Sequence, residues 1–275
     1  MKYGISIILL FILLIPKVYS QEKEEDENPL YTNKFVISGG LYSSAKSVGI
    51  NINGSGPNEI IDFSEGFDLN NNELTFFGSF DWRFAKRWIF TAEYFSIKNG
   101  NKWELEEDIS WGDVTFREGS NVKIGFGLDM YRAFVGWSVL QKPKHEIGMG
   151  LGVHDLQVSA FIAGDAYIND NDFKFERRSV SANAPLPNLG FWYYYVPTSK
   201  WFLTANLDIF SLTVGEYSGS LWNVRAGVNY QIFKHFGVGF SYRYFNFAAK
   251  VNKKYWEGDF NMIFQGPLLS IHANF

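Results

Sequence analysis

The stretch "LWNVRAGVNYQIF", residues 221–233, alternates strictly between two kinds of side chain. One parity is apolar throughout and consists of Trp222, Val224, Ala226, Val228, Tyr230 and Ile232. The other parity, from Asn223 to Gln231, is polar or glycine. Because a β-strand points successive side chains to opposite faces, the stretch predicts a strand with one apolar and one polar face. It is also longer than the usual soluble strand of about five or six residues.

The same alternation recurs along the chain and predicts ten strands. These are 34–46, 73–84, 88–98, 122–130, 145–163, 186–197, 202–210, 221–233, 236–244 and 259–275. Eight or twelve strands remain open, because strand boundaries read from sequence drift by several residues.

The predicted connections differ at the two ends of the strands. Four are tight, at 84–88, 141–146, 197–201 and 233–236. Five are longer and polar, near 47–72, 99–121, 164–185, 213–220 and 248–258. Short periplasmic turns and long extracellular loops are typical of an outer-membrane barrel. Aromatic residues flank the tight turns, where a girdle at the lipid interface is expected: Trp82, Phe84, Trp88, Trp201, Phe233 and Phe236.

The composition favours a membrane barrel over a soluble sandwich. Aromatic residues make up 19% of the chain, yet its mean hydropathy is −0.13, so apolar residues are dispersed among polar ones. No segment after the first twenty residues has the run of apolar residues that a spanning helix needs. Strands survive in lipid only as a closed barrel, which leaves no backbone group unpaired. We therefore predict an all-β fold, a transmembrane antiparallel up-and-down β-barrel.

The first 32 residues read as export and lead-in segments. Residues 1–20 have a lysine, an apolar core and small residues before Gln21, as in a cleavable signal peptide; an uncleaved anchor helix is the alternative. Residues 21–32 are acidic and without periodicity, which predicts a disordered lead-in. Residues 33–275 then form one barrel domain in the outer membrane of a Gram-negative bacterium.

Two strands break their own parity. Around residues 128–139 the apolar set changes from even to odd positions, and around 152–160 it changes from odd to even. A β-bulge would produce either shift. Alternatively, these stretches rise beyond the bilayer, where the facing no longer matters.

The inward faces carry charged side chains of both signs. The candidate lumen residues are Glu73, Asp81, Arg83, Glu93, Lys123, Asp129, Arg132, Asp208, Arg225, Arg243 and His272. One interpretation is a network of ion pairs that plugs the barrel, since buried charges need partners. The other is a polar path for a small solute, although the mixed signs argue against strong ion selectivity.

Other chemistry finds little support in the residues. The net charge of −4 does not point to nucleic acid, and the absence of cysteine excludes disulfides and zinc–thiolate sites. An omptin-like protease or a lipid A deacylase would need a histidine near the outer rim, and only His154, beside Asp155, is placed for it. These neighbours should point to opposite faces, which makes a poor dyad. Calcium binding by 104–108 or 169–172 is a weaker alternative to solvated loops. We predict no cofactor and no metal.

The whole mature chain resembles a family of Gram-negative outer-membrane β-barrel proteins with no assigned activity. The likeness rests on "DWRF" (81–84) with "YFS" (94–96), "ISWGDVTFREGSNV" (109–122), "LPNLG" (186–190), the stretch 210–245 and the closing "GPLLSIHANF" (266–275). It implies location and fold, and it brings no catalytic residues.

The resemblance also bears on the end of the chain and on partners. Phe275 follows alternating apolar residues and looks like the carboxy-terminal signal that the barrel-assembly machinery reads. The other expected partners are outer-membrane lipid and lipopolysaccharide. We expect a non-enzymatic role, either structural, in surface contact or in narrow solute passage. A hydrolase acting on lipid A or peptides is the alternative.

Overall fold

The computed structural model describes residues 28–53, 74–105, 108–111, 114–168, 172–253 and 256–275. Within them, no helix is long and apolar enough to span a membrane.

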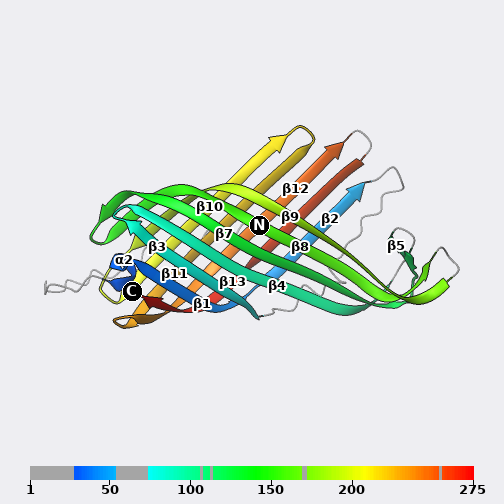
Figure 1. Ribbon diagram of the computed structural model, residues 1–275, viewed down its shortest axis with the longest axis horizontal. Helices are drawn as coiled ribbons and strands as arrows, with labels where there is room; N and C mark the ends of the chain where they lie inside the picture. Colours follow the sequence, from blue (N-terminus) through cyan, green and yellow to red (C-terminus); the bar gives the residue numbers. More distant parts are fainter. Residues whose placement is uncertain (1–27, 54–73, 106–107, 112–113, 169–171, 254–255) are drawn as a thin grey trace, which may run out of the picture.

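Long antiparallel strands pair in a closed ring, in the order β1, β3, β4, β7, β8, β9, β10, β11, β12, β13 and back to β1 (Figure 1). Their bounds are β1 Phe35–Ser43, β3 Leu74–Ala85, β4 Trp88–Glu104, β7 Asn121–Lys142, β8 His145–Ile168, β9 Asp172–Tyr195, β10 Trp201–Val214, β11 Tyr217–Phe233, β12 Phe236–Lys253 and β13 Trp256–Asn274. The predicted fold class, an antiparallel outer-membrane-type barrel, is confirmed.

Three shorter strands complete the sheet. β2 (Ala45–Asn53) follows β1 across Ser44 and pairs with β13 as β1 does, so the two act as one barrel strand. β5 (Ile109–Trp111) and β6 (Val114–Phe116) form a hairpin in the connection between β4 and β7, and β6 pairs with the far end of β8. The described residues therefore pair as a ring of ten barrel strands.

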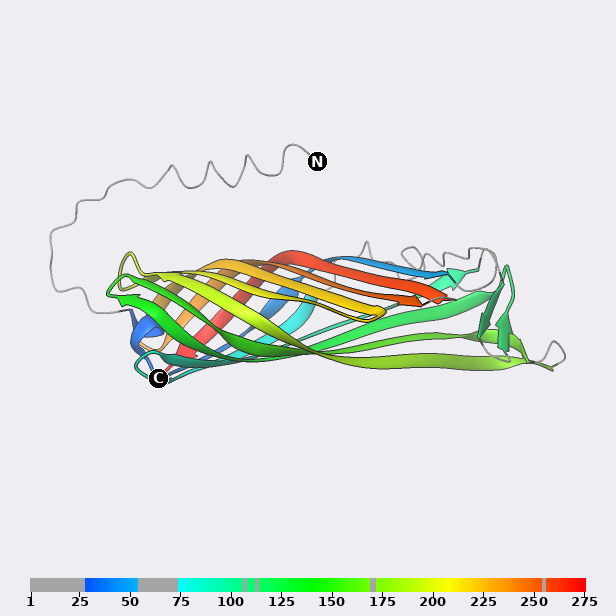
Figure 2. The ribbon, with the colours of Figure 1, turned by 90° about the horizontal axis from the view of Figure 1, so that it is seen from above.

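The two ends of the barrel differ. The turns around 86–87, 143–144, 196–200 and 234–235 lie at the end that holds the carboxyl terminus (Figure 2). At the other end, β8 and β9 extend farthest. Three predicted long loops are wrong: most of 164–185, 213–220 and 248–258 is strand. For example, β10 and β11 are joined by a tight turn in which Gly215 has a φ of 60°. The prediction failed because polar strands outside the bilayer resemble loops in composition.

The parity breaks on β7 and β8 are not bulges. On β8 the outward side chains are apolar up to Val153 and polar from Asp155 to Ser159. The inward ones become apolar at Leu156. Tyr131 pairs with Asp155 and Met130 with Leu156, so both strands change polarity at the same level. The register shift between these strands lies elsewhere, at Ser138/Leu140. The strands therefore rise out of the bilayer there.

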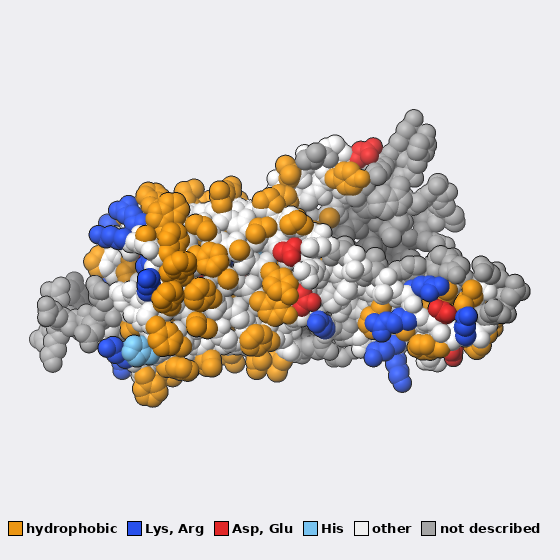
Figure 3. Space-filling model, in the orientation of Figure 1, with side chains coloured by type: hydrophobic (Ala, Val, Ile, Leu, Met, Phe, Trp, Pro, Cys, Tyr) orange, Lys and Arg blue, Asp and Glu red, His pale blue; other side chains and the backbone are white. Residues whose placement is uncertain are grey.

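This change of polarity divides the barrel into two halves. In the half near the short turns, apolar side chains cover the outer wall, and Figure 3 shows them as an orange band. In the other half the interior is apolar, with a cluster of fully buried side chains that includes Phe95, Leu128, Met130, Leu156, Phe245 and Phe264. The first half has the pattern required by lipid, and the second has that of a protein in water. We refer to them as the membrane half and the extracellular half.

A short helix closes the membrane half at the short-turn end. α2 (Pro29–Thr32) is N-capped by the Asn28 side chain, and the Tyr31 hydroxyl donates a hydrogen bond to the carbonyl of Lys142 at 2.7 Å. Tyr31 packs with Val196 and Phe202. The predicted disorder over 21–32 is thus wrong for residues 29–32, because the lead-in ends in apolar side chains that fill the barrel mouth. Residues 21–27 lie outside the described part.

The last strand closes the ring. β13 pairs with β12 on one side and with β1 on the other. At the very end, the Phe275 N–H donates to the Phe35 carbonyl at 2.8 Å, and the Phe35 N–H donates to the Phe275 carbonyl at 2.9 Å. Two backbone hydrogen bonds therefore fix Phe275 to the first residue of β1.

Candidate functional site in the barrel lumen

A charged network crosses the lumen at the top of the membrane half. Glu93 on β4 reaches across to Arg225 on β11, at 2.9 Å, and to Arg243 on β12, at 2.5 Å. The two arginines are directly opposite each other in the β11–β12 register. Like charges so placed repel, and Glu93 between them removes that repulsion. Arg243 is fully buried, with its guanidinium 5.3 Å from the Phe95 ring centroid.

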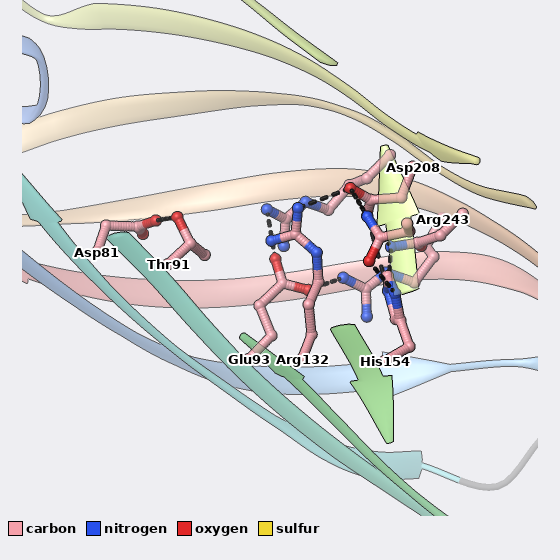
Figure 4. A network of polar contacts seen from close by, with 10 residues as sticks. Asp81, Thr91, Glu93, Arg132, His154, Asp208 and Arg243 are labelled. Atoms are coloured by element: carbon pink, nitrogen blue, oxygen red, sulfur yellow. Dashed lines mark hydrogen bonds and ion pairs between the residues drawn. The ribbon is translucent and has the colours of Figure 1, made fainter. Parts of the chain in front are cut away.

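A second group, centred on Asp208 of β10, lies beside the first (Figure 4). Asp208 accepts from Arg132 at 2.7 Å, from Asn188 at 3.2 Å and from Asn223 at 2.9 Å. His154 Nε2 lies 3.7 Å from the carboxylate, and its Nδ1 is 3.0 Å from Asn188 Oδ1. All five side chains are buried, and they come from five strands. The group therefore holds the barrel wall together across the lumen.

A third group sits nearer the short turns. Arg83 donates two hydrogen bonds to Glu146, at 3.2 and 3.0 Å, in a bidentate pair. Glu146 is fully buried and also accepts from Ser138 and from the indole N–H of Trp192. The Arg83 guanidinium lies 5.9 Å from the Tyr31 ring centroid, so this group lies next to α2.

Glycines on the inward face of the barrel make room for the aromatic rings beside this network. A Cβ at Gly148 would lie 1.9 Å from the Trp192 ring, and one at Gly190 would lie 2.4 Å from the Phe134 ring. The Phe134 and Trp192 rings themselves meet edge to face with centroids 5.9 Å apart. These rings occupy lumen that small residues would otherwise leave open.

Between the network and α2 lies a polar chamber. Its volume is about 120 Å³. Its lining includes Ser38, Ser79, Asp81, Asn206, Arg225, Asn229, Ser270 and His272, with Leu30 and Lys34 at the mouth. Asp81 accepts a 2.6 Å hydrogen bond from Thr91. His272 is buried and lies 3.2 Å from Gln231 Oε1. A cavity of this size and polarity suits several water molecules.

Charges of the two signs balance in this part of the lumen. The described residues here carry four carboxylates and four arginines: Asp81, Glu93, Glu146, Asp208, Arg83, Arg132, Arg225 and Arg243. Buried ions are tolerated when each has an oppositely charged partner and hydrogen bonds. Glu93, Glu146 and Asp208 each form an ion pair with arginine, whereas Asp81 is bonded to the Thr91 hydroxyl, so most of the charge in this part of the lumen is paired.

Most predicted lumen residues do line the interior, and two do not. Asp81, Arg83, Glu93, Arg132, Asp208, Arg225, Arg243 and His272 are inward. Glu73 lies outside the described residues. Lys123 and Asp129 were assigned to the lumen wrongly, because they lie on β7 above the change of polarity and point outward. Lys123 is exposed, and Asp129 accepts from the Tyr94 hydroxyl at 2.9 Å and lies 3.9 Å from Lys98.

Sequence reasoning missed several members of the network. Glu146 was placed in a turn, although its parity on β8 matches that of His154 and predicts an inward side chain. Asn188 and Asn223 also have the inward parity of their strands, but the candidates were chosen among charged or titratable residues. The sequence suggests His154 only as a catalyst at the outer rim, whereas it lies in the middle of the lumen and is fully buried.

The described residues do not form the dyad or the metal site that was considered from the sequence. His154 points inward and Asp155 outward, so the pair is not a dyad. Within the described ranges, no group of three or more His, Asp or Glu side chains could hold a metal ion. The calcium candidates 104–108 and 169–172 lie partly outside the described residues.

The predicted girdle residues surround the short turns on the outer wall. Trp82, Phe84, Trp88, Trp201, Phe233 and Phe236 are all exposed. The Phe84 ring contacts those of Trp82 and Trp88, with centroids 5.4 and 6.2 Å apart. Exposed aromatic rings beside the turns mark the lower edge of the apolar band.

A closed antiparallel ring, an apolar outer band and a polar lumen together define an integral β-barrel of the Gram-negative outer membrane. Solved structures with this fold include the outer membrane protease OmpT from Escherichia coli. It matches with a TM-score of 0.56 at 9% identity, over 94% of this chain and 99% of that one.

Weaker matches include the outer membrane protein OprG from Pseudomonas aeruginosa, with a TM-score of 0.35 at 9% identity, over 92% of this chain and 99% of that one. The attachment invasion locus protein Ail from Yersinia pestis has a TM-score of 0.29 at 9% identity, over 86% and 98%. No protein family matches the sequence, and no curated protein does so either. At such identities the likeness is one of fold.

Proposed function

We propose that the protein is a closed, non-enzymatic outer-membrane barrel that acts through its extracellular surface. The observation that carries this proposal is the filling of the lumen at three successive levels. α2 covers the mouth, the Glu93 and Asp208 groups cross the middle, and the apolar cluster fills the extracellular half. A solute would have to displace all three, which argues against passage.

The extracellular half supports a role in surface contact. β7, β8 and β9 are 22, 24 and 24 residues long, far more than the 9–11 or so that a tilted strand needs to cross a bilayer. Beyond the band these strands turn mostly polar side chains outward, with Asp129, Asp155 and Gln157 at the lower edge of this wall and the exposed Phe173 and Phe175 farther out on β9. A rigid polar wall projecting from the membrane suits contact with other molecules at the cell surface.

The fold shared with OmpT does not by itself favour a hydrolase here. OmpT is named as a protease, and at 9% identity that activity does not transfer with the fold. The histidine weighed for such chemistry, His154, is fully buried and bonded to Asn188. A catalytic histidine must reach its substrate, which this one does not.

Conductance of the refolded protein in planar lipid bilayers tests the proposal. We expect a silent bilayer for the natural sequence. Stable conductance steps that change in Arg225→Ala, but not in the outward-facing Lys98→Gln, would instead indicate passage through the lumen. Turnover of lipid A or a peptide by the same preparation, lost in His154→Ala, would contradict the non-enzymatic role.

A further inference from the structure

Every short turn at the α2 end of the barrel is basic. The four turns, at 85–88, 142–145, 196–200 and 233–236, contain no Asp or Glu. With the residue before β1 they carry the exposed cations Lys34, Lys86, Arg87, Lys142, Lys144, Lys200 and Lys234. We call this set the basic rim. It is unexpected in a chain of net charge −4, and Figure 3 shows blue side chains gathered at this end, next to the apolar band.

Two rim cations sit over aromatic rings of the outer wall. The Arg87 guanidinium lies 5.7 Å from the centroid of Trp137, and Lys34 Nζ lies 5.5 Å from that of Phe35. Trp137 is exposed, and Phe35 stacks on Trp82 at 6.2 Å. Interfacial aromatic rings mark the level of lipid headgroups, and lysine and arginine stems lie along such surfaces with their charges in water. Arg87 and Lys34 therefore lie against interfacial aromatic rings of the outer wall, and Lys34 also borders the lumen chamber.

The like charges of the rim repel one another and favour an anionic partner. Because short turns face the periplasm in such barrels, the rim borders the apolar band at the level of the inner leaflet. We propose that the basic rim is a binding collar for anionic phospholipids of that leaflet, with phosphatidylglycerol as the simplest ligand. The competing occupant is the acidic segment 21–27 of this chain, which directly precedes α2.

The lipid preference of the full mature chain tests this proposal directly. The chain is reconstituted in phosphatidylcholine bilayers, and association of spin-labelled phosphatidylglycerol is compared with that of spin-labelled phosphatidylcholine. Several cations acting on neighbouring anionic lipids should give a preference for phosphatidylglycerol of about threefold or more. We expect that preference at low salt and its loss near 1 M salt, where the Debye length is about 3 Å.

Two variants that lose the same number of cations distinguish the effect of the rim from the effect of the net charge on lipid binding. The rim variant is Lys86→Gln, Arg87→Gln, Lys142→Gln, Lys200→Gln and Lys234→Gln. The control changes as many cations in the extracellular half: Lys98→Gln, Lys102→Gln, Lys123→Gln, Lys174→Gln and Arg177→Gln. Both must first show the heat-dependent gel shift of a folded barrel. We expect the rim variant to lose the preference and the control to keep it.

Three results would overturn the proposal. One is an equal association of the two lipids with the natural sequence. Another is a preference that survives in the rim variant or disappears equally in the control. The third is a preference that emerges only after residues 21–27 are deleted, which would mean that the acidic segment occupies the rim. Bilayer conductance is a separate measurement, so failure here leaves the proposed function standing.

Discussion

Glu93 is the residue on which the lumen network depends most. It is the carboxylate between two arginines that face each other across neighbouring strands; Glu93 and Arg243 are buried, and the Arg225 side chain is 20% exposed. Removing it leaves Arg225 and Arg243 as adjacent cations in the lumen. The loss of one partner of a buried ion pair costs about 3–5 kcal/mol.

We therefore expect Glu93→Ala to lower the free energy of unfolding of the barrel by about 3–5 kcal/mol. Reversible urea unfolding in lipid vesicles, followed by tryptophan fluorescence, measures this change. The matched control is Asp129→Asn, which breaks a more exposed carboxylate–lysine pair and should cost less than about 1 kcal/mol. A similar loss in both variants would mean that the network does not stabilise the barrel.

The two carboxylates in this comparison also show what sequence could predict at this scale. Both Glu93 and Asp129 lie opposite an apolar parity, and both were assigned to the lumen on that ground. The assumption that the polar parity faces the lumen holds for Glu93, because the opposite, outward face of that part of β4 contacts lipid. It fails for Asp129 because water, not lipid, surrounds that part of β7, and the apolar side chains there point inward. Alternation predicts that two faces differ, but only the surrounding solvent decides which face is inside.

At the scale of elements, β8 contains the boundary between these two solvents. Its outward side chains Leu151 and Gln157 share one face of one strand, on opposite sides of the change of polarity. Leu151 is 68% exposed in the middle of the apolar band. Gln157 pairs across the ladder with Asp129. A cation should be costly at the first position and harmless at the second.

We expect Leu151→Arg to reduce the free energy of folding into lipid vesicles by about 2–4 kcal/mol, since arginine is destabilising near the bilayer midplane. Gln157→Arg should change it by less than about 0.5 kcal/mol, as surface substitutions usually do. Equilibrium folding into phosphatidylcholine vesicles measures both. Equal penalties would show that the bilayer reaches past Asp155, and the assigned boundary would then be wrong.

For the elements as a whole, the sequence predicted the strands best where lipid faces them. The membrane portions of nine of the ten predicted strands match the observed ones, and the tenth, 122–130, covers only the extracellular part of β7. The predicted loops failed where strands run on in water, as in 213–220, because a polar strand lacks the apolar face that marks it. α2 was missed because a single helical turn such as 29–32 has no periodicity, and its position depends on tertiary contacts between Tyr31 and the turn at Lys142.

At the scale of the whole molecule, the barrel combines two kinds of stability. The membrane half is held by backbone pairing around a lumen whose charged side chains are largely paired. The extracellular half is stabilised by an apolar core inside a mostly polar wall. Closure of the ring joins both, since β13 pairs with β1 in the membrane half and with β2 in the extracellular half. β13 is therefore the strand through which both halves of the ring are closed.

Phe275 should matter more for assembly in the cell than for the stability of the finished barrel. Its backbone closes the ring with Phe35, and alanine would keep both of those hydrogen bonds. Its side chain is 60% exposed and stacks on His235 with ring centroids 6.0 Å apart, so Phe275→Ala should change the unfolding midpoint of the refolded protein little.

If the assembly machinery recognises the phenyl group of Phe275, the amount of folded Phe275→Ala barrel in outer-membrane fractions should fall severalfold. Phe236→Ala, at another exposed aromatic of the same edge, is the control and should leave that amount unchanged. Equal amounts for all three proteins, or an equal fall in both variants, would remove Phe275 as the assembly signal and leave it as one girdle aromatic among several.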